Sequence, residues 1–240
     1  FKLRVIGDYS SIDEICCFAG SVVAGPTTPA VFAVGGAVDP NNISSRNTFL
    51  NRAPLNQIES YGASAQMDYQ AGPFSLTSIT SYREVTSLLE SDVDYTSADI
   101  VDNIIDQKIE IFTQEFRIAS DFDGPFNFLL GGYYFNESVA QDSQLITGQD
   151  TRLLFELLAG APGTFAGVEA GLGLPANSIF SPGLLTDERF TLDNEAFSIF
   201  GTVDLEVTDR LTLTGGFNYT DDKKEFTANM TAFDPLGQVN

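Results

Sequence analysis

Residues 196–226 show the clearest alternation of apolar and polar positions in the chain. On both sides of Thr208–Arg210, most apolar residues occupy odd positions and most polar residues occupy even positions. Successive side chains of a strand point to opposite faces, so this pattern predicts a long hairpin with one apolar and one polar face. Each arm exceeds the roughly 5–6 residues of an average strand and suits a tilted bilayer crossing. A hairpin of a soluble, secreted β-sandwich with long recognition loops remains the alternative.

Five earlier segments also alternate and predict strands, which makes seven in total. They are Phe1–Tyr9, Ile58–Ala71, Phe74–Glu90, Lys108–Ser120 and Phe126–Ser138. The alternation breaks near Ser78–Ile79, which predicts a β-bulge there.

The predicted connections are long and short in strict turn. The short ones are Ala71–Pro73, Asp121–Pro125 and Thr208–Arg210, and the others run to tens of residues. A β-sandwich has no reason to sort its loops in this way. A transmembrane β-barrel has short periplasmic turns and long extracellular loops. The sequence therefore favours a membrane barrel, and seven strands predict only a part of one, because bacterial barrels close with an even number from eight upward.

In such a barrel the two faces of the last hairpin have definite environments. Its polar side chains should face the lumen and its apolar side chains the lipid, with the turn at the periplasmic side. The predicted lumenal set is Ser198, Thr202, Asp204, Thr212, Thr214 and Asn218, and the predicted lipid-facing set is Phe197, Val203, Leu205, Leu211 and Phe217.

The long segments show no sustained period and are predicted to be loops. Residues 10–56 and 91–106 are expected to be irregular, and the second of these is acidic. Within the third, Gln141–Arg189, the run Arg152–Ala159 predicts a short helix capped by Asp150 or Thr151. Residues 160–182, which are rich in Gly, Ala and Pro, are expected to be irregular.

Composition excludes several classes of function. The chain has 33 acidic and 12 basic residues and a formal charge of −21, which argues against nucleic acid as a partner. It has no histidine, so His-dependent nucleophilic catalysis and His–zinc sites are excluded from it. No carboxylate pair or phosphate-binding loop stands out, and we expect no enzyme activity and no cofactor.

Two features offer weaker chemical signals. The aspartates of residues 91–106 can be imagined around Ca²⁺, but the Gly and closing Glu of an EF-hand loop are missing, so we expect a solvated charge run and no metal site. The adjacent Cys16 and Cys17 can form a vicinal disulfide, pair outside this chain, or stay reduced. The first ten residues lack the features of a signal peptide, which indicates either a protein that is not exported or a piece of a longer chain.

The chain resembles the β-barrel region of TonB-dependent outer-membrane receptors, especially those of the siderophore-receptor group. The stretches that carry the resemblance are SLTSITSYRE (75–84), DVDY (92–95), TQEFRIAS (113–120), FDGPFNFLLGGYYFNE (122–137) and FGTVDLEVTDRLTLTGGFNYTDDKKEF (200–226). The family often has Arg where this chain has Asn218.

The resemblance implies that residues 1–240 are part of a 22-stranded barrel whose plug domain and remaining strands lie outside this sequence. It implies a location in the outer membrane of a Gram-negative bacterium, with outer-membrane lipid, the plug, TonB and a ferric siderophore or a similar ligand as partners. Four residues are candidates for the lumenal surface: Glu115, Arg117, Asp204 and Asn218. Glu115 and Arg117 can contact plug or substrate, or form an ordinary ion pair across strands. Tyrosines such as Tyr69, Tyr82, Tyr133 and Tyr134 are expected at the membrane boundaries.

Overall fold

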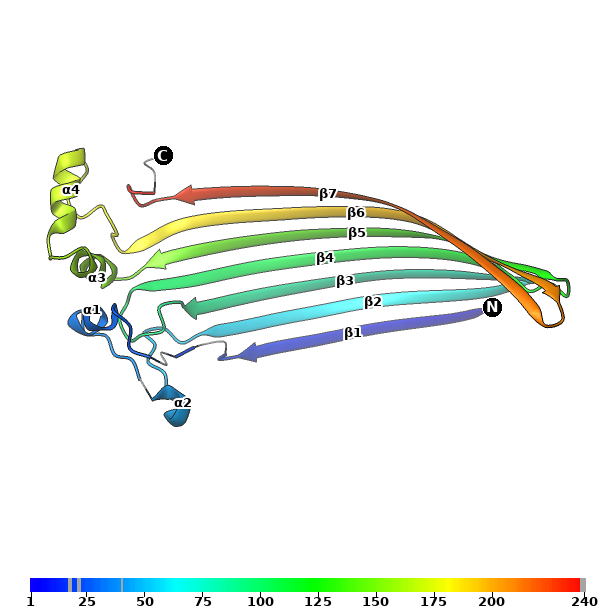
Figure 1. Cartoon of the computed structure of the whole chain (residues 1–240), viewed down its shortest axis with the longest axis horizontal. Coiled ribbons are helices and arrows are strands. Elements are labelled where there is room, and N and C mark those ends of the chain that lie inside the picture. The colour runs from blue at the N-terminus through cyan, green and yellow to red at the C-terminus, as the bar shows by residue number, and fades with distance from the viewer. Residues whose placement is uncertain (17–18, 21–22, 40, 238–240) are drawn as a thin grey trace.

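A single antiparallel sheet of seven strands makes up most of the molecule (Figure 1). The computed structural model describes residues 1–16, 19–20, 23–39 and 41–237. Each strand pairs with the next one along the chain, in the order β1-β2-β3-β4-β5-β6-β7. The strands are β1 (Lys2–Glu14), β2 (Leu55–Ala71), β3 (Phe74–Asp92), β4 (Val101–Ser120), β5 (Phe126–Thr147), β6 (Gly183–Thr208) and β7 (Leu211–Ala232). The predicted all-β meander is confirmed, and the described residues contain no second sheet of the kind a β-sandwich requires.

The strands are longer than the sequence pattern predicted. β4 begins at Val101, within the predicted acidic loop, and β5 continues to Thr147. β6 begins at Gly183 and has 26 residues, the longest of the seven. The added length lies in every case at the end of the strand remote from the short turns.

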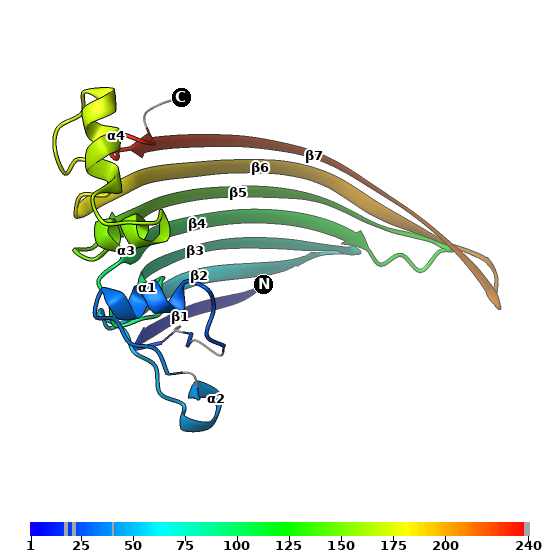
Figure 2. The same ribbon diagram turned by 60° about the vertical axis from the view of Figure 1, so that its left-hand side comes forward.

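Short and long connections lie at opposite ends of the sheet (Figures 1 and 2). The long ones contain α1 (Thr28–Ala33), α2 (Asn42–Ser45), α3 (Thr151–Leu158) and α4 (Thr164–Leu172). α3 confirms the predicted helix and its N-cap at Asp150, although that side chain makes no cap hydrogen bond. The expectation of irregular structure was wrong at α1, α2 and α4. No helix in the described part of the chain is long and apolar enough to cross a membrane.

The predicted bulge at Ser78–Ile79 is wrong. Ser78 pairs with Phe116 and Ile79 with Glu115 in a continuous register. The alternation breaks there because Ser78 stands on the apolar face, where its hydroxyl accepts a hydrogen bond from the Gln114 amide at 3.1 Å. The register shifts instead near Leu145 in the β5–β6 pair and next to the β6–β7 turn.

Among the described residues, the buried apolar side chains lie in the connections and not in the sheet. Val31, Ala98, Ile100 and Leu154 form one small cluster among the long connections. Both faces of the sheet are open, and the edge strands β1 and β7 are exposed along almost their whole length. Exposed edges of this length normally pair with further strands.

Candidate functional site: the two faces of the sheet and its mouth

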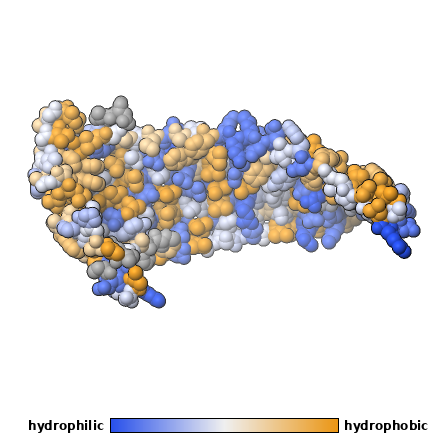
Figure 3. Space-filling model, in the orientation of Figure 1, coloured by the Kyte–Doolittle hydropathy of each residue, from blue (hydrophilic) through white to orange (hydrophobic). Residues whose placement is uncertain are grey.

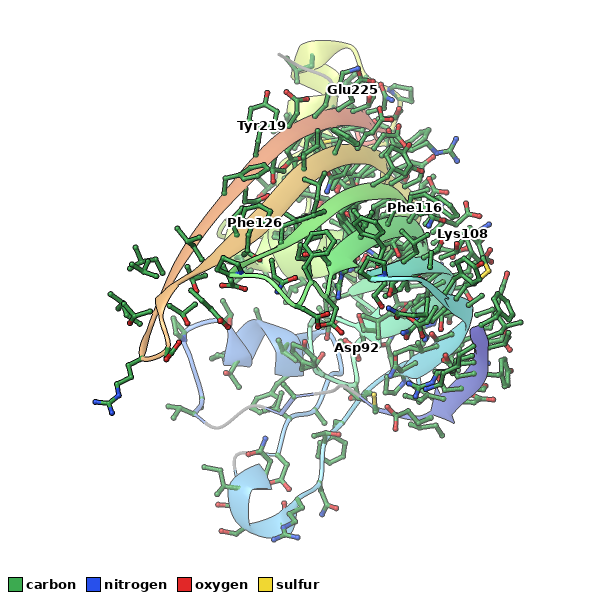
Figure 4. The ribbon with its side chains drawn as sticks, turned by 90° about the vertical axis from the view of Figure 1, so that its right-hand side faces the viewer. Asp92, Lys108, Phe116, Phe126, Tyr219 and Glu225 are labelled. Carbon is green, nitrogen blue, oxygen red and sulfur yellow. The ribbon has the colours of Figure 1, made fainter. Side chains whose placement is uncertain are left out.

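The sheet is curved, and the side chains of its two faces differ in chemistry. In Figure 4, viewed along the strands, the ribbons form an arc with Phe116, Lys108, Tyr219 and Glu225 on its outer side. Residues paired directly across neighbouring strands share a face, so the register extends this assignment to the whole sheet. Odd residues of β6 and β7 lie on the convex face and even residues lie on the concave face. The predicted separation of the two sets is confirmed.

An apolar belt covers the convex face in the half of the sheet next to the short turns. Its large side chains are exposed, for example Phe116 at 61% and Phe217 at 57%. Its members are Leu3, Val5, Met67, Leu76, Phe116, Ile118, Phe126, Phe128, Leu130, Phe197, Ile199, Val203, Leu205, Leu213 and Phe217. A continuous apolar surface of this size marks contact with another apolar phase.

Tyrosines lie at the upper edge of the apolar belt, which is the edge remote from the short turns, where the convex face becomes charged. The Tyr82 hydroxyl donates hydrogen bonds to Glu110 at 2.9 Å and to Glu84 at 3.0 Å. The Tyr134 hydroxyl donates to Glu195 at 2.9 Å in the same way. Each ring therefore lies toward the belt while its hydroxyl reaches carboxylates above it, which is how aromatic residues behave at a membrane–water boundary.

A shallow hollow of about 810 Å³ lies within the apolar belt. It is open between large side chains such as Phe116 and Leu130 because Ser78 and Gly132 are small. Its lining is almost entirely apolar, and it lies on the face opposite the predicted lumenal residues. It is therefore a feature of the apolar surface and not a candidate solute site.

The four predicted lumenal residues all lie on the concave face. Arg117 donates from Nε to the Glu115 carboxylate, so the ion pair lies along one strand and not across two strands as the simpler interpretation had it. Glu115 and Asn218 line a common hollow of about 340 Å³. Asp204 lies apart from them and accepts a hydrogen bond from the Thr214 hydroxyl at 2.6 Å.

On the concave face, hydrogen bonds of the Arg83 side chain join β1, β2 and β3, and these contacts were not predicted. Arg83 bonds both oxygens of the Asp8 carboxylate, at 2.7 and 2.8 Å, and the Ser60 hydroxyl at 2.8 Å. The guanidinium crosses β2 directly above Gly62, where an added Cβ would lie 3.1 Å from it. A Gly in the middle of a strand was the sequence signal for such a close approach.

The long connections are packed together into one unit at the mouth of the sheet. We call residues 28–37, 92–101 and 148–158 the mouth body. Val31 of α1 and Leu154 of α3 pack with Ala98 and Ile100 of the β3–β4 connection. Backbone groups add cross-links, since Gly148 N donates to Ile100 O at 2.7 Å. Three connections distant in sequence therefore share one core.

Asp99 is the polar centre of the mouth body. Its carboxylate accepts hydrogen bonds from the Asn51 amide at 3.0 Å and from Gln149 N at 2.9 Å. Its own backbone N–H donates to the Asp150 carboxylate at 2.9 Å. The Asp150 carboxylate therefore links the β5–β6 connection to the β3–β4 connection, which explains why it makes no cap hydrogen bond to α3.

The prediction that the acidic segment, residues 91–106, is a solvated charge run was wrong, and Asp92 shows this most clearly. Only 2% of its surface is exposed, and its carboxylate accepts hydrogen bonds from the backbone of Asn51, Asp94 and Tyr95. Burial, together with the nearby Asp94 charge, raises the pKa of the Asp92 carboxyl to about 6. The carboxylates of this segment organise backbone turns, and the described residues contain no cluster of three metal-ligating side chains.

The β5–β6 connection is held by a buried ion pair. Arg152 donates to Glu169 at 2.6 Å and to Ile179 O at 2.8 Å. Glu169 also accepts backbone N–H groups from Asn177 and Ile179, at 3.0 and 2.9 Å. The Arg152 hydrogen bonds hold the pKa of the Glu169 carboxyl at about 2. The Phe180 ring stacks on Phe155 at 4.6 Å, which completes the unit.

The three states considered for Cys16 and Cys17, a vicinal disulfide, pairing outside this chain or reduced thiols, cannot be compared with the structure, because Cys17 lies outside the described residues.

Comparison with known proteins shows a likeness of fold only. No protein-family model and no curated protein sequence matches the chain. Among solved structures, it is similar to the ferric yersiniabactin uptake receptor FyuA from Yersinia pestis, with a TM-score of 0.53 and 12% sequence identity. The match covers 76% of this chain and 23% of that receptor. The sheet thus has the fold of part of a receptor barrel, and it spans about a quarter of the length of the protein it matches.

Proposed function

We propose that this chain forms part of the wall of a TonB-dependent receptor in the outer membrane of a Gram-negative bacterium. The whole protein would import a scarce and bulky substrate, with a ferric siderophore as the first candidate. The observation that carries this proposal is the opposite polarity of the two faces at one height. The convex face is an exposed apolar belt, and the concave face opposite it carries Glu115, Arg117 and Asn218.

The height of the apolar belt agrees with a membrane crossing. On β6 it runs from Leu205 to Phe197. At about 3.3 Å per residue this is roughly 26 Å along the strand, or roughly 20 Å along the membrane normal at a tilt of about 40°. The lipid-facing band of outer-membrane barrels is about 25 Å tall. The longer, charged half of each strand then stands outside the membrane and carries the mouth body.

Further strands must complete such a barrel, and the edges of β1 and β7 are where they would pair. The resemblance and the fold support a plug domain, a contact with TonB and a ligand in the lumen as partners of the whole protein. In this arrangement the wall described here supplies lumenal surface and three extracellular connections.

Site-directed spin labelling tests the position of the wall in the membrane. Labels are placed at Leu205 and at the neighbouring Asp204 of the full-length gene product, in a background with Cys16 and Cys17 replaced by Ser, and the protein is reconstituted in lipid vesicles. We expect the Leu205 label to be relaxed by oxygen, which concentrates in lipid, and the Asp204 label by a water-soluble nickel chelate. Equal accessibility at both positions would contradict the membrane crossing. A product that is monodisperse without detergent would favour the soluble binding module.

A transport assay tests the role of the whole protein. Cells lacking the gene should lose TonB-dependent uptake of at least one radiolabelled ferric siderophore, and the wild-type gene should restore it. Normal uptake of every complex tried, in cells without the gene, would remove iron–siderophore import from the proposal while leaving the membrane position intact.

A further inference from the structure

The apolar positions of the strands change face halfway along the sheet. On β6, Val203 and Leu205 are convex, whereas Leu192 and Phe190 are concave. On β5, Phe128 and Leu130 are convex, whereas Val139 is concave. β3, β4 and β7 change in the same manner at the same height, just above the tyrosines. Beyond that height the convex face is charged and the concave face carries the apolar side chains.

One row of apolar side chains crosses the concave face above the belt. We call it the inner apolar row: Val85, Ile109, Val139, Leu192 and Phe226, each paired directly with the next. Phe190 stacks on Phe226 with ring centroids 6.2 Å apart and an angle of 13° between planes. Figure 3 shows a hydrophobic band across the strands in the half next to the helices. On the convex face at this height stand Glu84, Glu110 and Glu225.

The charges around the inner apolar row disfavour an anionic occupant. Eight of the twelve basic residues of the chain are engaged in ion pairs. The other four lie elsewhere: Lys2 and Arg4 near the turn end of β1, Arg210 in the β6–β7 turn, and Arg46 after α2. Two of the paired ones, Arg83 and Lys224, lie on the concave face directly below the row, and each is neutralised by a carboxylate, that of Asp8 or Asp222. Two acidic residues on the same face form no ion pair with the described residues, Glu137 directly below the row and Glu188 above Phe190, so the net charge beside the row is negative.

Glu137 and Glu188 also distinguish a solute from a covering segment of protein. Neither forms an ion pair within the described part of the chain. A protein segment packed over the row would dehydrate both carboxylates, which is unfavourable without a basic partner. A small solute can cover the apolar side chains and leave the carboxylates in water, or can bring its own positive charge to them.

We propose that the inner apolar row binds an apolar, aromatic solute that carries no net negative charge. This inference rests on the proposed function, because the concave face becomes a lumen only in the closed barrel. It adds the chemical class of the molecule that the lumen accepts: neutral or cationic, with an aromatic surface that can lie against Phe190 and Phe226. It predicts rejection of polyanionic ligands.

Two fluorescent probes with one aromatic skeleton test the charge rule. N-phenyl-1-naphthylamine is neutral, and 8-anilino-1-naphthalenesulfonate adds a sulfonate. The full-length gene product in lipid nanodiscs should bind the neutral probe at a saturable site, at least about tenfold more tightly than the anionic one. Equal affinity for the two probes, or tighter binding of the anion, would overturn the proposal.

Substitutions one residue apart test the location. Val139→Asn and Leu192→Asn should each weaken saturable binding of the neutral probe about tenfold or more. Ser138→Asn and Asp193→Asn, on the convex face of the same strands, should leave it unchanged. Thermal unfolding is measured on all four variants. If Val139→Asn lowers the unfolding temperature and the wild type has no saturable site, the row is covered by protein and the proposal is wrong.

Failure of this inference is distinguishable from failure of the proposed function. Spin-label accessibility at Leu205 and Asp204 reports the membrane position independently of any probe. A protein that crosses the membrane as expected but prefers the anionic probe contradicts only the inference about the solute.

Discussion

Replacing Gly148 by Ala should loosen all three segments of the mouth body together. A Cβ at this position would lie 2.1 Å from Asp99 Oδ1 and 2.2 Å from Asp99 O. The second of these is a backbone atom and cannot rotate away. The β5–α3 segment must therefore separate from the β3–β4 connection. That separation stretches the bonds from Gly148 N to Ile100 O and from Asp150 N to Asp99 O, 2.7 and 2.9 Å long.

The size of the effect follows from these contacts. Overpacking costs about 1–3 kcal/mol, and each lost hydrogen bond costs about 1 kcal/mol. One overpacked contact and two lost hydrogen bonds total about 3–5 kcal/mol, which corresponds to roughly a hundred- to several-thousandfold faster local opening. Because Val31 of α1 packs on Ala98, Ile100 and Leu154, α1 should open with α3, although Gly148 does not touch α1.

Hydrogen exchange read by mass spectrometry, on the full-length gene product, checks this expectation. Amides of α1 and α3 should both exchange faster in Gly148→Ala. Gly124→Ala, in the short turn before β5 where an added Cβ meets nothing within 4 Å, is the control and should change neither helix. Faster exchange in α3 with unchanged exchange in α1 would refute the reasoning, because the connections would then open independently.

Three further predictions concern single side chains. Arg152→Met should speed amide exchange in α4 by roughly two orders of magnitude, because it removes one partner of a buried ion pair. Since the pKa of Glu169 is held at about 2, the protection of α4 in the wild type should be complete above about pH 4.5 and should fall as the pH drops toward 2. Protection that stays constant over that range would contradict the role of the ion pair. For Asp92 the sign is opposite: its pKa of about 6 lies above the ordinary 3.8, so stability is greatest at low pH and is lost as the pH rises through 6. Exchange in the β3–β4 connection, corrected for intrinsic rates, should therefore slow between pH 7.5 and pH 5, and Asp92→Asn should abolish this dependence. Leu130→Arg, in the middle of the apolar belt, should lower the free energy of unfolding in vesicles by about 2–4 kcal/mol. Leu129→Arg, on the concave face, should change this free energy little. Equal losses in the two variants would place both residues in the same environment and contradict the prediction.

Periodicity and turn chemistry were sufficient to predict the strands, the three short turns, the helix α3 and the division of the last hairpin into two faces. The other helices were missed for a physical reason. α4 contains four small residues, Ala166, Gly167, Ala170 and Gly171, among its nine, and its apolar positions define no single face. α1 and α2 have only six and four residues, too few for a helical period to show.

The contacts of the candidate site depend on residues far apart in sequence, and local patterns carry little information about them. Asp99 meets Asn51 and Gln149 across separations of 48 and 50 residues. Arg83 meets Asp8 across 75 residues. Gly62 and Gly148 are the local signals of these two meetings, since each stands where another part of the chain approaches too closely for a side chain.

The errors in strand length have one origin, and that origin is informative about the molecule. The predicted strands ended at Lys108, Ser138, Ala196 and Phe226, all close to the height where apolar side chains change from the convex to the concave face. The apolar–polar alternation is interrupted where it changes face, so a strand predicted from one continuous alternation ends there. The backbone hydrogen bonds between the strands continue past that point. A strand in uniform surroundings has no reason to change its phase. Five adjacent strands that do so at one height, marked by Tyr82 and Tyr134, require surroundings that change at that height on both faces at once. In the arrangement that we propose, a membrane surface provides this change outside the sheet, and an apolar solute above a polar interior provides it inside.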